Sequence, residues 1–267
     1  MTDERLAKII QEKRKKIIPS TSELIKETFK EINYIPQTKT LDGKIIGITP
    51  KFALNNFNQM LKHVFDYALV VLERYEDSLY IDNIIPEICN LRADILRKIK
   101  NDNPIEFSNL IVKSLYNDLW QMMLSRSQSR KQRGGKDWEY EIAYMLDLIN
   151  ISYDMQTGKD RSDFKIPSKK AFEEDRTKTI LLSAKRSLRE RWKQVASELH
   201  NTRATNVYLA TTEIAKKLPL NKVNEIWDYN VHLLVWDDTK AEFPDHPGIV
   251  SFSDFAKRDI PTFKKFW

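Results

Sequence analysis

Hydrophobic positions change their spacing near residue 126 of the chain. Between residues 50 and 72, apolar side chains such as Leu61 and Val64 recur every three or four positions, a spacing that is typical of an amphipathic helix. Two further segments show the same kind of pattern, at 86–100 and 104–124. Residues 1–125 are therefore predicted to form a mainly helical N-terminal region.

Short apolar runs replace this helical spacing in the second part of the chain. Five of them predict strands, at 152–156, 162–166, 179–184, 206–211 and 231–236. Helical patterns lie before and between these strands, at 137–148, 188–201 and 221–229. Helices and strands in this order are typical of an α/β fold with a central mixed sheet flanked by helices. We predict such a core over residues 126–267.

A polar segment joins the two regions. Residues 125–136 carry five basic side chains and contain the adjacent glycines Gly134 and Gly135. On composition alone, this segment fits an exposed linker between two domains. Composition leaves open whether it also belongs to a functional surface.

Composition narrows the class of protein. The chain has 267 residues, of which 41% are hydrophobic, and a net charge of +6; this charge is compatible with a polyanionic partner without identifying one. The single cysteine, Cys89, excludes a disulfide framework within the chain and a thiolate zinc site. The sequence has no run of about 18 apolar residues and no secretory segment after Met1. We therefore expect a cytoplasmic protein without a membrane partner.

Three residues carry the candidate chemistry. Asp163 stands where a strand would begin, Lys185 directly follows the apolar run 179–184, and Glu198 lies on the next predicted helix. Carboxylates hold hard divalent cations, and a bound metal ion lowers the pKa of the water that attacks a phosphodiester. A lysine near the phosphate supplies positive charge. An Asp, a Lys and a Glu in this order therefore indicate a metal-dependent phosphodiesterase site.

The acids of this site depart from the usual order of the class. The usual arrangement places an acid two residues before the lysine, where this chain has Ser183. Glu198 on the following helix is positioned to replace that acid, and Glu139 and Glu141 are positioned to approach from the helix at 137–148. The alternative is that the Asp belongs to a turn, the Lys is solvated and the Glu forms a surface ion pair.

A charged triplet near the start of the same helix is a candidate base reader. An Arg side chain donates two hydrogen bonds to guanine O6 and N7, and a Glu side chain accepts one from cytosine N4. Arg189, Glu190 and Arg191 therefore suit stacked G and C bases. The alternative is a solvated, charged turn of helix.

The segment that begins at Ser183, with Asp163 before it and Glu198 after it, resembles the type II restriction endonucleases of the EcoRII, PspGI and SsoII group. The resemblance is strongest over residues 161–198 and weaker over 125–149. It implies the PD-(D/E)XK nuclease fold, with the second acid moved from a strand to a helix. It also implies a Mg²⁺-dependent homodimer that cuts double-stranded DNA at a short palindrome with CC and GG halves and leaves 5′ overhangs. A companion DNA cytosine methyltransferase belongs to such a system.

The resemblance also implies roles for individual positions. The implied catalytic residues are Asp163, Lys185, Glu198 and Glu139, with Mg²⁺ held by Asp163 and Glu198. The implied base contacts are Arg189, Glu190, Arg191 and Gln128. Glu141 remains open as the additional acid in place of Glu139. The Pro that usually precedes the Asp is absent, and Ser162 stands in its place.

Base flipping is a further implication of the resemblance. Members of the group flip a central base against an aromatic residue of the N-terminal region, for which Phe52, Phe57 and Tyr75 are candidates in this chain. The central base pair of the recognition site therefore stays open.

Two other functions compete with this interpretation. Another nuclease of the same fold, acting in DNA repair, would not need the Arg-Glu-Arg triplet. A DNA-binding regulator that uses the helix at 188–201 for recognition would leave Asp163 and Lys185 without a role.

Overall fold

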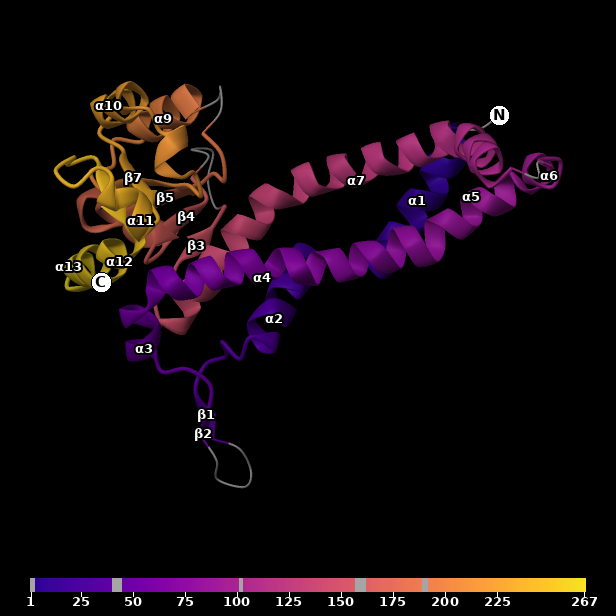
Figure 1. The fold of residues 1–267 in the computed structure, drawn as a ribbon. Coiled ribbons are helices and arrows are strands. Elements are labelled where there is room, and N and C mark those ends of the chain that lie inside the picture. The colour runs from indigo at the N-terminus through magenta and orange to yellow at the C-terminus, as the bar shows by residue number, and fades with distance from the viewer. Residues whose placement is uncertain (1–2, 40–44, 101–102, 157–161, 189–191) are drawn as a thin grey trace. The chain divides into compact units, whose positions relative to one another are not determined.

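The computed structural model describes residues 3–39, 45–100, 103–156, 162–188 and 192–267 (Figure 1). Contacts within the chain define two compact units, each assembled from two stretches of sequence. The first unit comprises residues 1–26 and 67–134, and the second comprises residues 27–66 and 135–267. Helices α4 (Phe57–Asp77) and α7 (Pro104–Leu148) contribute residues to both units.

The first unit is helical, and residues 27–66 of the predicted N-terminal region belong to the second unit. Besides its parts of α4 and α7, it contains α1 (Asp3–Ile17), the start of α2 (Thr21–Glu31), the π-helical segment η1 (Ser78–Ile84), α5 (Ile85–Leu91) and α6 (Ala93–Leu96). A buried carboxylate ties α4 to α7. Glu76 is 2% exposed, and it accepts hydrogen bonds from Arg126 Nε at 2.8 Å and from Arg130 Nε at 2.9 Å.

The polar segment 125–136 is helical, and the sequence passes from the first unit to the second within it, between Gly134 and Gly135. It lies inside α7, which runs for 45 residues without a break. Arg, Lys and Gln are good helix formers, and two of the basic residues, Arg126 and Arg130, gain a buried partner in Glu76. Composition did not predict the helix here, because composition does not reveal tertiary ion pairs of this kind.

The second unit is built on a six-stranded sheet whose strands follow one another in sequence order. They are β3 (Asp154–Met155), β4 (Phe164–Ile166), β5 (Ile180–Ala184), β6 (Val207–Ala210), β7 (His232–Val235) and β8 (Ile249–Ser251). The pairs β3–β4 and β4–β5 are antiparallel, and the pairs from β5 to β8 are parallel. The predicted mixed sheet is confirmed. The sequence pattern misses β8, which lies between Gly248 and the helix that begins at Phe252.

Helices and turns connect the strands of this sheet. They are α8 (Lys169–Glu174), the 3-10 turn η2 (Arg176–Lys178), α9 (Trp192–Asn201), the 3-10 turn η3 (Ala215–Lys217), α10 (Leu220–Asp228), α11 (Asp237–Ala241), α12 (Phe252–Asp254), the π-helical segment η4 (Phe255–Asp259) and α13 (Ile260–Lys264). Within the described ranges, no helix combines the length and the apolar character that a membrane crossing requires.

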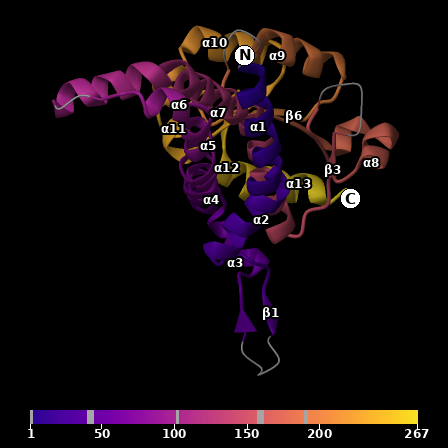
Figure 2. The same cartoon turned by 90° about the vertical axis from the view of Figure 1, so that its right-hand side faces the viewer.

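A small hairpin precedes α4 in the second unit. Its strands, β1 (Thr38–Lys39) and β2 (Ile45–Ile46), pair antiparallel and lead into α3 (Pro50–Asn55) (Figure 2). The sequence pattern does not predict these two-residue strands, because they are exposed and carry no alternation. The residues between the strands, 40–44, lie outside the described part of the chain.

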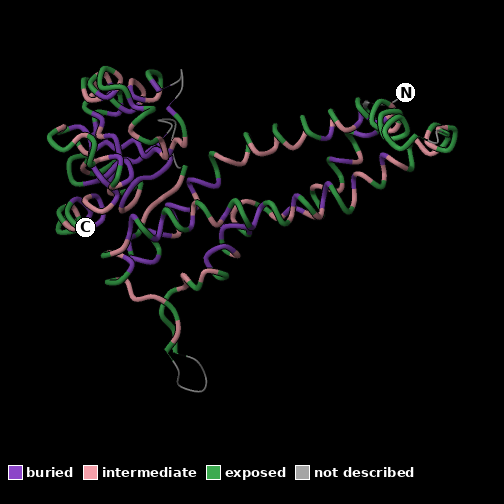
Figure 3. The backbone as a smooth tube through the Cα atoms, viewed as in Figure 1, coloured by how far each residue is buried: buried purple, intermediate pink, exposed green. Residues whose placement is uncertain are grey.

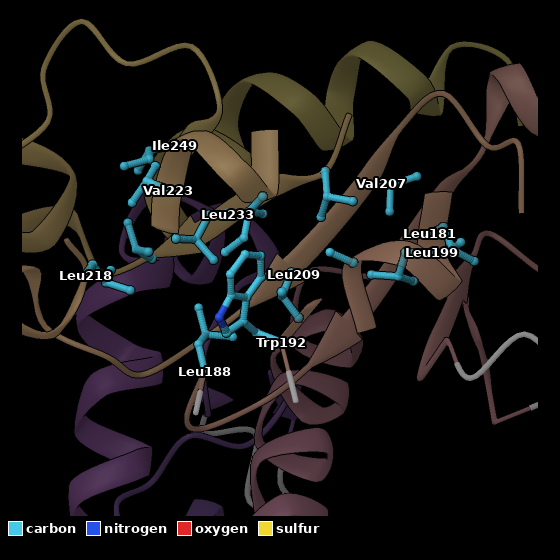
Figure 4. Packing of buried hydrophobic residues seen from close by; sticks show 14 of the residues in the cluster. Leu181, Leu188, Trp192, Leu199, Val207, Leu209, Leu218, Val223, Leu233 and Ile249 are labelled. Carbon is cyan, nitrogen blue, oxygen red and sulfur yellow. The ribbon is translucent and has the colours of Figure 1, made fainter. Parts of the chain in front are cut away.

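One face of the sheet packs against α9 and α10. Successive side chains of a strand alternate between the two faces, and Leu181 and Leu209 occupy the same face. There they form a buried cluster with Leu233 of β7, Trp192 of α9 and Val223 of α10 (Figure 4). All residues of β4, β5 and β6 are buried (Figure 3). This packing fixes α9 over the face to which every second side chain of β5 points.

An aromatic cluster holds the C-terminal end of α7 against the sheet. Trp138 is fully buried, and its indole nitrogen donates a hydrogen bond to the carbonyl oxygen of Ala210 on β6 at 3.4 Å. Its ring meets those of Phe65, Trp236 and Phe252 at centroid distances of 5.8, 5.6 and 5.8 Å. The residues next to Trp138 on α7 are therefore fixed relative to the sheet.

A buried charged pair joins the same part of α7 to the chain just after β5. Arg186 Nη2 lies 3.4 Å from Oε1 of the fully buried Glu141, and the guanidinium stands 4.6 Å from the ring centroid of Phe65. Burial raises the pKa of Glu141 to about 8, although the charge of Arg186 acts in the opposite direction. The folded chain therefore keeps this carboxyl group protonated to a higher pH than the unfolded chain does.

Replacing Glu141 should reduce the pH dependence of stability. Because the folded state holds the proton more tightly, the contribution of Glu141 to the free energy of unfolding falls as the pH rises from 4.5 to about 8. The stability advantage of the wild type over Glu141→Gln, measured by urea unfolding, should therefore be larger near about pH 5.5 than near about pH 8.5. Leu146→Val, a buried apolar change on the same helix, should give the same stability difference at both pH values. A stability difference between the wild type and Glu141→Gln that is equal at both pH values would contradict the expectation.

Candidate active site

Asp163 and Lys185, the first two residues of the predicted site, meet where β4 begins and β5 ends. These strands are antiparallel neighbours, with Phe164 opposite Leu182, so the residue before β4 and the residue after β5 lie at the same edge of the sheet. The Lys185 ammonium donates to Asp163 Oδ2 at 2.8 Å. The backbone nitrogen of Lys185 donates to the carbonyl oxygen of Ala210 at 2.8 Å, which fixes the lysine to β6.

Three donors converge on one oxygen of Asp163. Besides Lys185, Ser183 Oγ donates to Oδ2 at 2.9 Å and the backbone nitrogen of Ala184 donates to it at 2.6 Å. Asp163 is 7% exposed, and a buried carboxylate is stable only when hydrogen bonds or opposite charges replace its hydration. In the described part of the chain, the side-chain contacts of Asp163 all fall on Oδ2. Asp163 is therefore the residue of this pair that would hold a metal ion.

Ser183 occupies the position at which the usual arrangement has an acid. The side chain is fully buried, and its hydroxyl group donates to Asp163. A carboxylate at this position would face Asp163 with a second negative charge, whereas a hydroxyl group stabilises the first. Ser183 therefore helps to hold the carboxylate of Asp163, the residue directly before β4, in place.

Glu139 lies next to this pair. It is buried on α7, directly after Trp138, and its Oε2 accepts a hydrogen bond from Gln156 Nε2 at 2.5 Å. Burial raises the pKa of Glu139, and the negative charge of Asp163 raises it further, while the Gln156 hydrogen bond and the charge of Lys185 lower it. Glu139 is thus close enough to Asp163 and Lys185 to share their electrostatic field.

The two candidates for the additional acid occupy different surroundings. Glu141 pairs with Arg186 inside the protein, whereas Glu139 stands beside Asp163 and Lys185. The geometry favours Glu139 for the additional acid, and its catalytic role remains a prediction.

Glu198 lies on α9, the helix that packs over the Leu181 face of the sheet. Every second side chain of a strand points to the same face. Counting from Leu181 of β5, Ser183 and Lys185 therefore point to the face that α9 covers. Glu198 is partly buried, and its Oε1 accepts a hydrogen bond from Gln194 at 2.9 Å. The proposed role of Glu198 as a metal ligand rests on this shared side and remains a prediction.

The donors at this site suit Mg²⁺. The ion usually binds through one or two carboxylates and completes its shell with water and substrate phosphate oxygens. Asp163 and Glu139 supply such oxygens within one small region. Among the described residues, no group of three or more His, Cys, Asp or Glu side chains is assembled around one point. Asp163 and Glu139 would supply part of the shell of such an ion.

The predicted base readers are only partly described. Arg189, Glu190 and Arg191 lie outside the described residues. Gln128 is exposed on α7 in the first unit, where its amide is available to solvent.

The candidates for stacking on a flipped base differ in burial. Phe52 is 53% exposed on α3, Phe57 is 1% exposed in the core, and Tyr75 is partly buried on α4. A ring buried as deeply as Phe57 cannot receive a base without local rearrangement, so Phe52 and Tyr75 fit this role better.

Gln156 is the site residue that sequence reasoning missed. The sequence pattern placed it at the end of a predicted strand, with no sign of a role for its side chain. Only the folded chain shows that it contacts Glu139 and that its backbone nitrogen donates to the carbonyl oxygen of Asp163 at 3.0 Å.

Comparisons with known proteins agree with this geometry. The family model described as EcoRII C terminal matches residues 106–256 of the chain. The type II restriction enzyme SsoII of Shigella sonnei is 23% identical over 181 residues, which are 63% of this chain and 59% of that protein. The chain thus aligns with less than two thirds of the length of this relative.

Two solved structures share the fold. The structure of metal-depleted Ecl18kI in complex with uncleaved, modified DNA has a TM-score of 0.83 at 21% identity, over 100% of this chain and 86% of that chain. The complex of the restriction endonuclease PspGI with substrate DNA has a TM-score of 0.62 at 21% identity, over 94% of this chain and 95% of that chain. The resemblance and the fold class predicted from the sequence are confirmed. Since the family model spans more than half of the chain, including β3 to β8, the chain belongs to the EcoRII C-terminal family of the EcoRII, PspGI and SsoII group and has the PD-(D/E)XK fold.

Proposed function

We propose that the chain is a type II restriction endonuclease that hydrolyses phosphodiester bonds of double-stranded DNA with Mg²⁺ as cofactor. The observation that carries the proposal is the Asp163–Lys185 pair, held by Ser183 and the Ala184 amide at the edge of the sheet. Family membership supports it, because the matched residues include this pair and Glu198. The relatives with solved structures are described as DNA complexes.

The residues of the site divide the work of hydrolysis. A bound Mg²⁺ would lower the pKa of the attacking water and offset negative charge on the phosphate. Asp163, whose position is fixed by three hydrogen bonds, would hold such an ion, and Glu198 and Glu139 are proposed to complete the acidic set. The ammonium group of Lys185 faces the same region and stabilises the negative charge that builds up on the phosphate oxygens in the transition state.

Recognition is proposed to follow the code of the group. Arg189, Glu190, Arg191 and Gln128 read CC and GG halves of a short palindrome, and cleavage leaves 5′ overhangs. A palindrome requires two-fold symmetry of the protein, so we propose a homodimer. A companion cytosine methyltransferase would protect the DNA of the host from this activity.

Digestion of a sequenced plasmid tests the proposal directly. With Mg²⁺, the protein should produce discrete fragments whose mapped ends lie at palindromes with CC and GG halves and carry 5′ extensions. With EDTA, the plasmid should remain intact. Ends scattered over the sequence would indicate a nuclease of the same fold without a specific site. Specific retention of DNA without any cleavage would indicate a regulator and would overturn the proposal.

Removing either member of the Asp163–Lys185 pair should stop cleavage while the protein stays folded. Asp163→Asn should leave no detectable cleavage, and Lys185→Met should slow it by about 100- to 1000-fold, because an electrostatic contact to the transition state is lost. DNA binding without metal should persist in both variants. Lys62→Met and Asp238→Asn break a similar pair of 2.7 Å elsewhere in the second unit, and they should cleave at the wild-type rate. Cleavage by Asp163→Asn at that rate would remove Asp163 from the site.

The acid moved to α9 gives a second test. Glu198→Ala should lose cleavage as Asp163→Asn does, whereas Ser183→Ala should be much milder, because the Ala184 amide and Lys185 still hold Asp163. Ser183→Glu combined with Glu198→Ala should recover part of the activity. As a control, Glu225→Ala removes a carboxylate that forms an ion pair with Lys193 of α9. This variant should cleave at the wild-type rate. Wild-type cleavage by Glu198→Ala would show that the acid has not moved.

A further inference from the structure

Gln156 has an unusual backbone conformation directly beside the site. It follows β3, and its φ of 50° lies in the left-handed region, which L-residues other than Asn, Asp and Gly rarely adopt. Three of the other four non-glycine residues with positive φ are asparagines, which suit this conformation. Gln156 and Arg203 are the two described residues with positive φ that are neither asparagine nor glycine, and only Gln156 lies beside the site.

The side chain and backbone of Gln156 contact both acids of the site. Nε2 donates to Glu139 Oε2 at 2.5 Å, and the backbone nitrogen donates to the carbonyl oxygen of Asp163 at 3.0 Å. One residue therefore links α7, which carries Glu139, to the start of β4, which carries Asp163. Gln156 itself is exposed, so its side chain contributes little to the packing of the core.

The two acids need such a link because they repel each other. Glu139 and Asp163 are both buried, at 8% and 7% exposure, so little water screens one carboxylate from the other, and the hydrogen bond from Gln156 holds the Glu139 group in place. Asp163 is held by three donors of its own, whereas a Glu side chain has three rotatable bonds with which to turn away. A neutral amide donor orients Glu139 without adding a charge that would compete with a divalent cation.

We propose that Gln156 is a positioning residue that holds the Glu139 carboxylate toward Asp163, so that both acids are in place for the divalent cation. The inference rests on the proposed nuclease function and gives Glu139 a defined orientation within it. Gln156 touches neither the DNA nor the reacting atoms in this role, and it acts only through Glu139.

The strained backbone allows a test that separates this role from a structural one. Gln156→Gly removes the amide side chain, keeps the backbone hydrogen bond to Asp163, and places at this position the residue that adopts a positive φ most readily. The thermal midpoint of Gln156→Gly should therefore be equal to or above that of the wild type. The single-turnover cleavage rate should nevertheless fall by about 10- to 100-fold, the usual effect of removing a partner that orients a metal-site ligand.

A matched control is available at another left-handed residue. Arg203 follows α9 with a φ of 56° and is exposed. Arg203→Gly relieves the same kind of strain without touching either acid, so its thermal midpoint should be equal to or above that of the wild type and its cleavage rate unchanged. The affinity of both variants for a cognate duplex in EDTA should match that of the wild type, which excludes a loss of DNA binding.

A double-mutant cycle shows whether Gln156 acts through Glu139. Glu139→Gln alone should slow cleavage. Adding Gln156→Gly should slow it no further, because each change removes the oriented carboxylate of Glu139 from the site. Additive losses would assign Gln156 an independent role and overturn the proposal, as would wild-type cleavage by Gln156→Gly. Absence of cleavage by the wild-type protein would contradict the nuclease function itself, so the two failures are distinguishable.

Discussion

The buried negative charge of Asp163 is the constraint on which the site depends. A carboxylate removed from water is costly unless donors replace its hydration, and three donors meet at its Oδ2. Ser183, Ala184 and Lys185 are consecutive residues, and they supply these donors from the end of one strand. The register of β4 against β5 therefore has to be correct for the charge to be tolerated. A shift by one residue would turn Ser183 and Lys185 to the opposite face.

The rest of the second unit keeps this arrangement rigid. The sheet is buried on both faces around β5 (Figure 3), and α9 is fixed over one face by the cluster around Leu181 and Trp192 (Figure 4). Trp138 anchors α7 beside the site, so Glu139 approaches from a fixed backbone. The Glu141–Arg186 pair restrains the chain immediately after Lys185. Helix α7 thus contributes Glu139, and the end of β5 contributes the donors that hold Asp163.

Sequence pattern predicted this core well where the physical signal is local. A continuous apolar run is required for a strand buried on both faces, so 179–184 was identifiable, and with it the lysine that follows. The extent of α7 was not predictable, because the partner of Arg126 and Arg130 is a glutamate about 50 residues earlier in the chain. Gln156 was invisible for the same reason, since its importance comes from a left-handed backbone and a distant carboxylate. Contacts between segments that lie far apart in the sequence produce no periodic pattern of apolar and polar residues, so the sequence alone does not reveal them.

The position of a bound metal ion, found by diffraction, decides whether Asp163 belongs to the catalytic site. Crystals of the protein with a cognate duplex, soaked with Mn²⁺ and measured at an anomalous wavelength, report the ion independently of any cleavage assay. We expect an anomalous peak at about 2.1 Å from Asp163 Oδ1, the oxygen that accepts none of the three hydrogen bonds, with a carboxylate oxygen of Glu139 or Glu198 in or beside its coordination shell. A fully occupied peak elsewhere on the protein, with none at Asp163, would contradict the central claim that this carboxylate is organised to hold the catalytic metal.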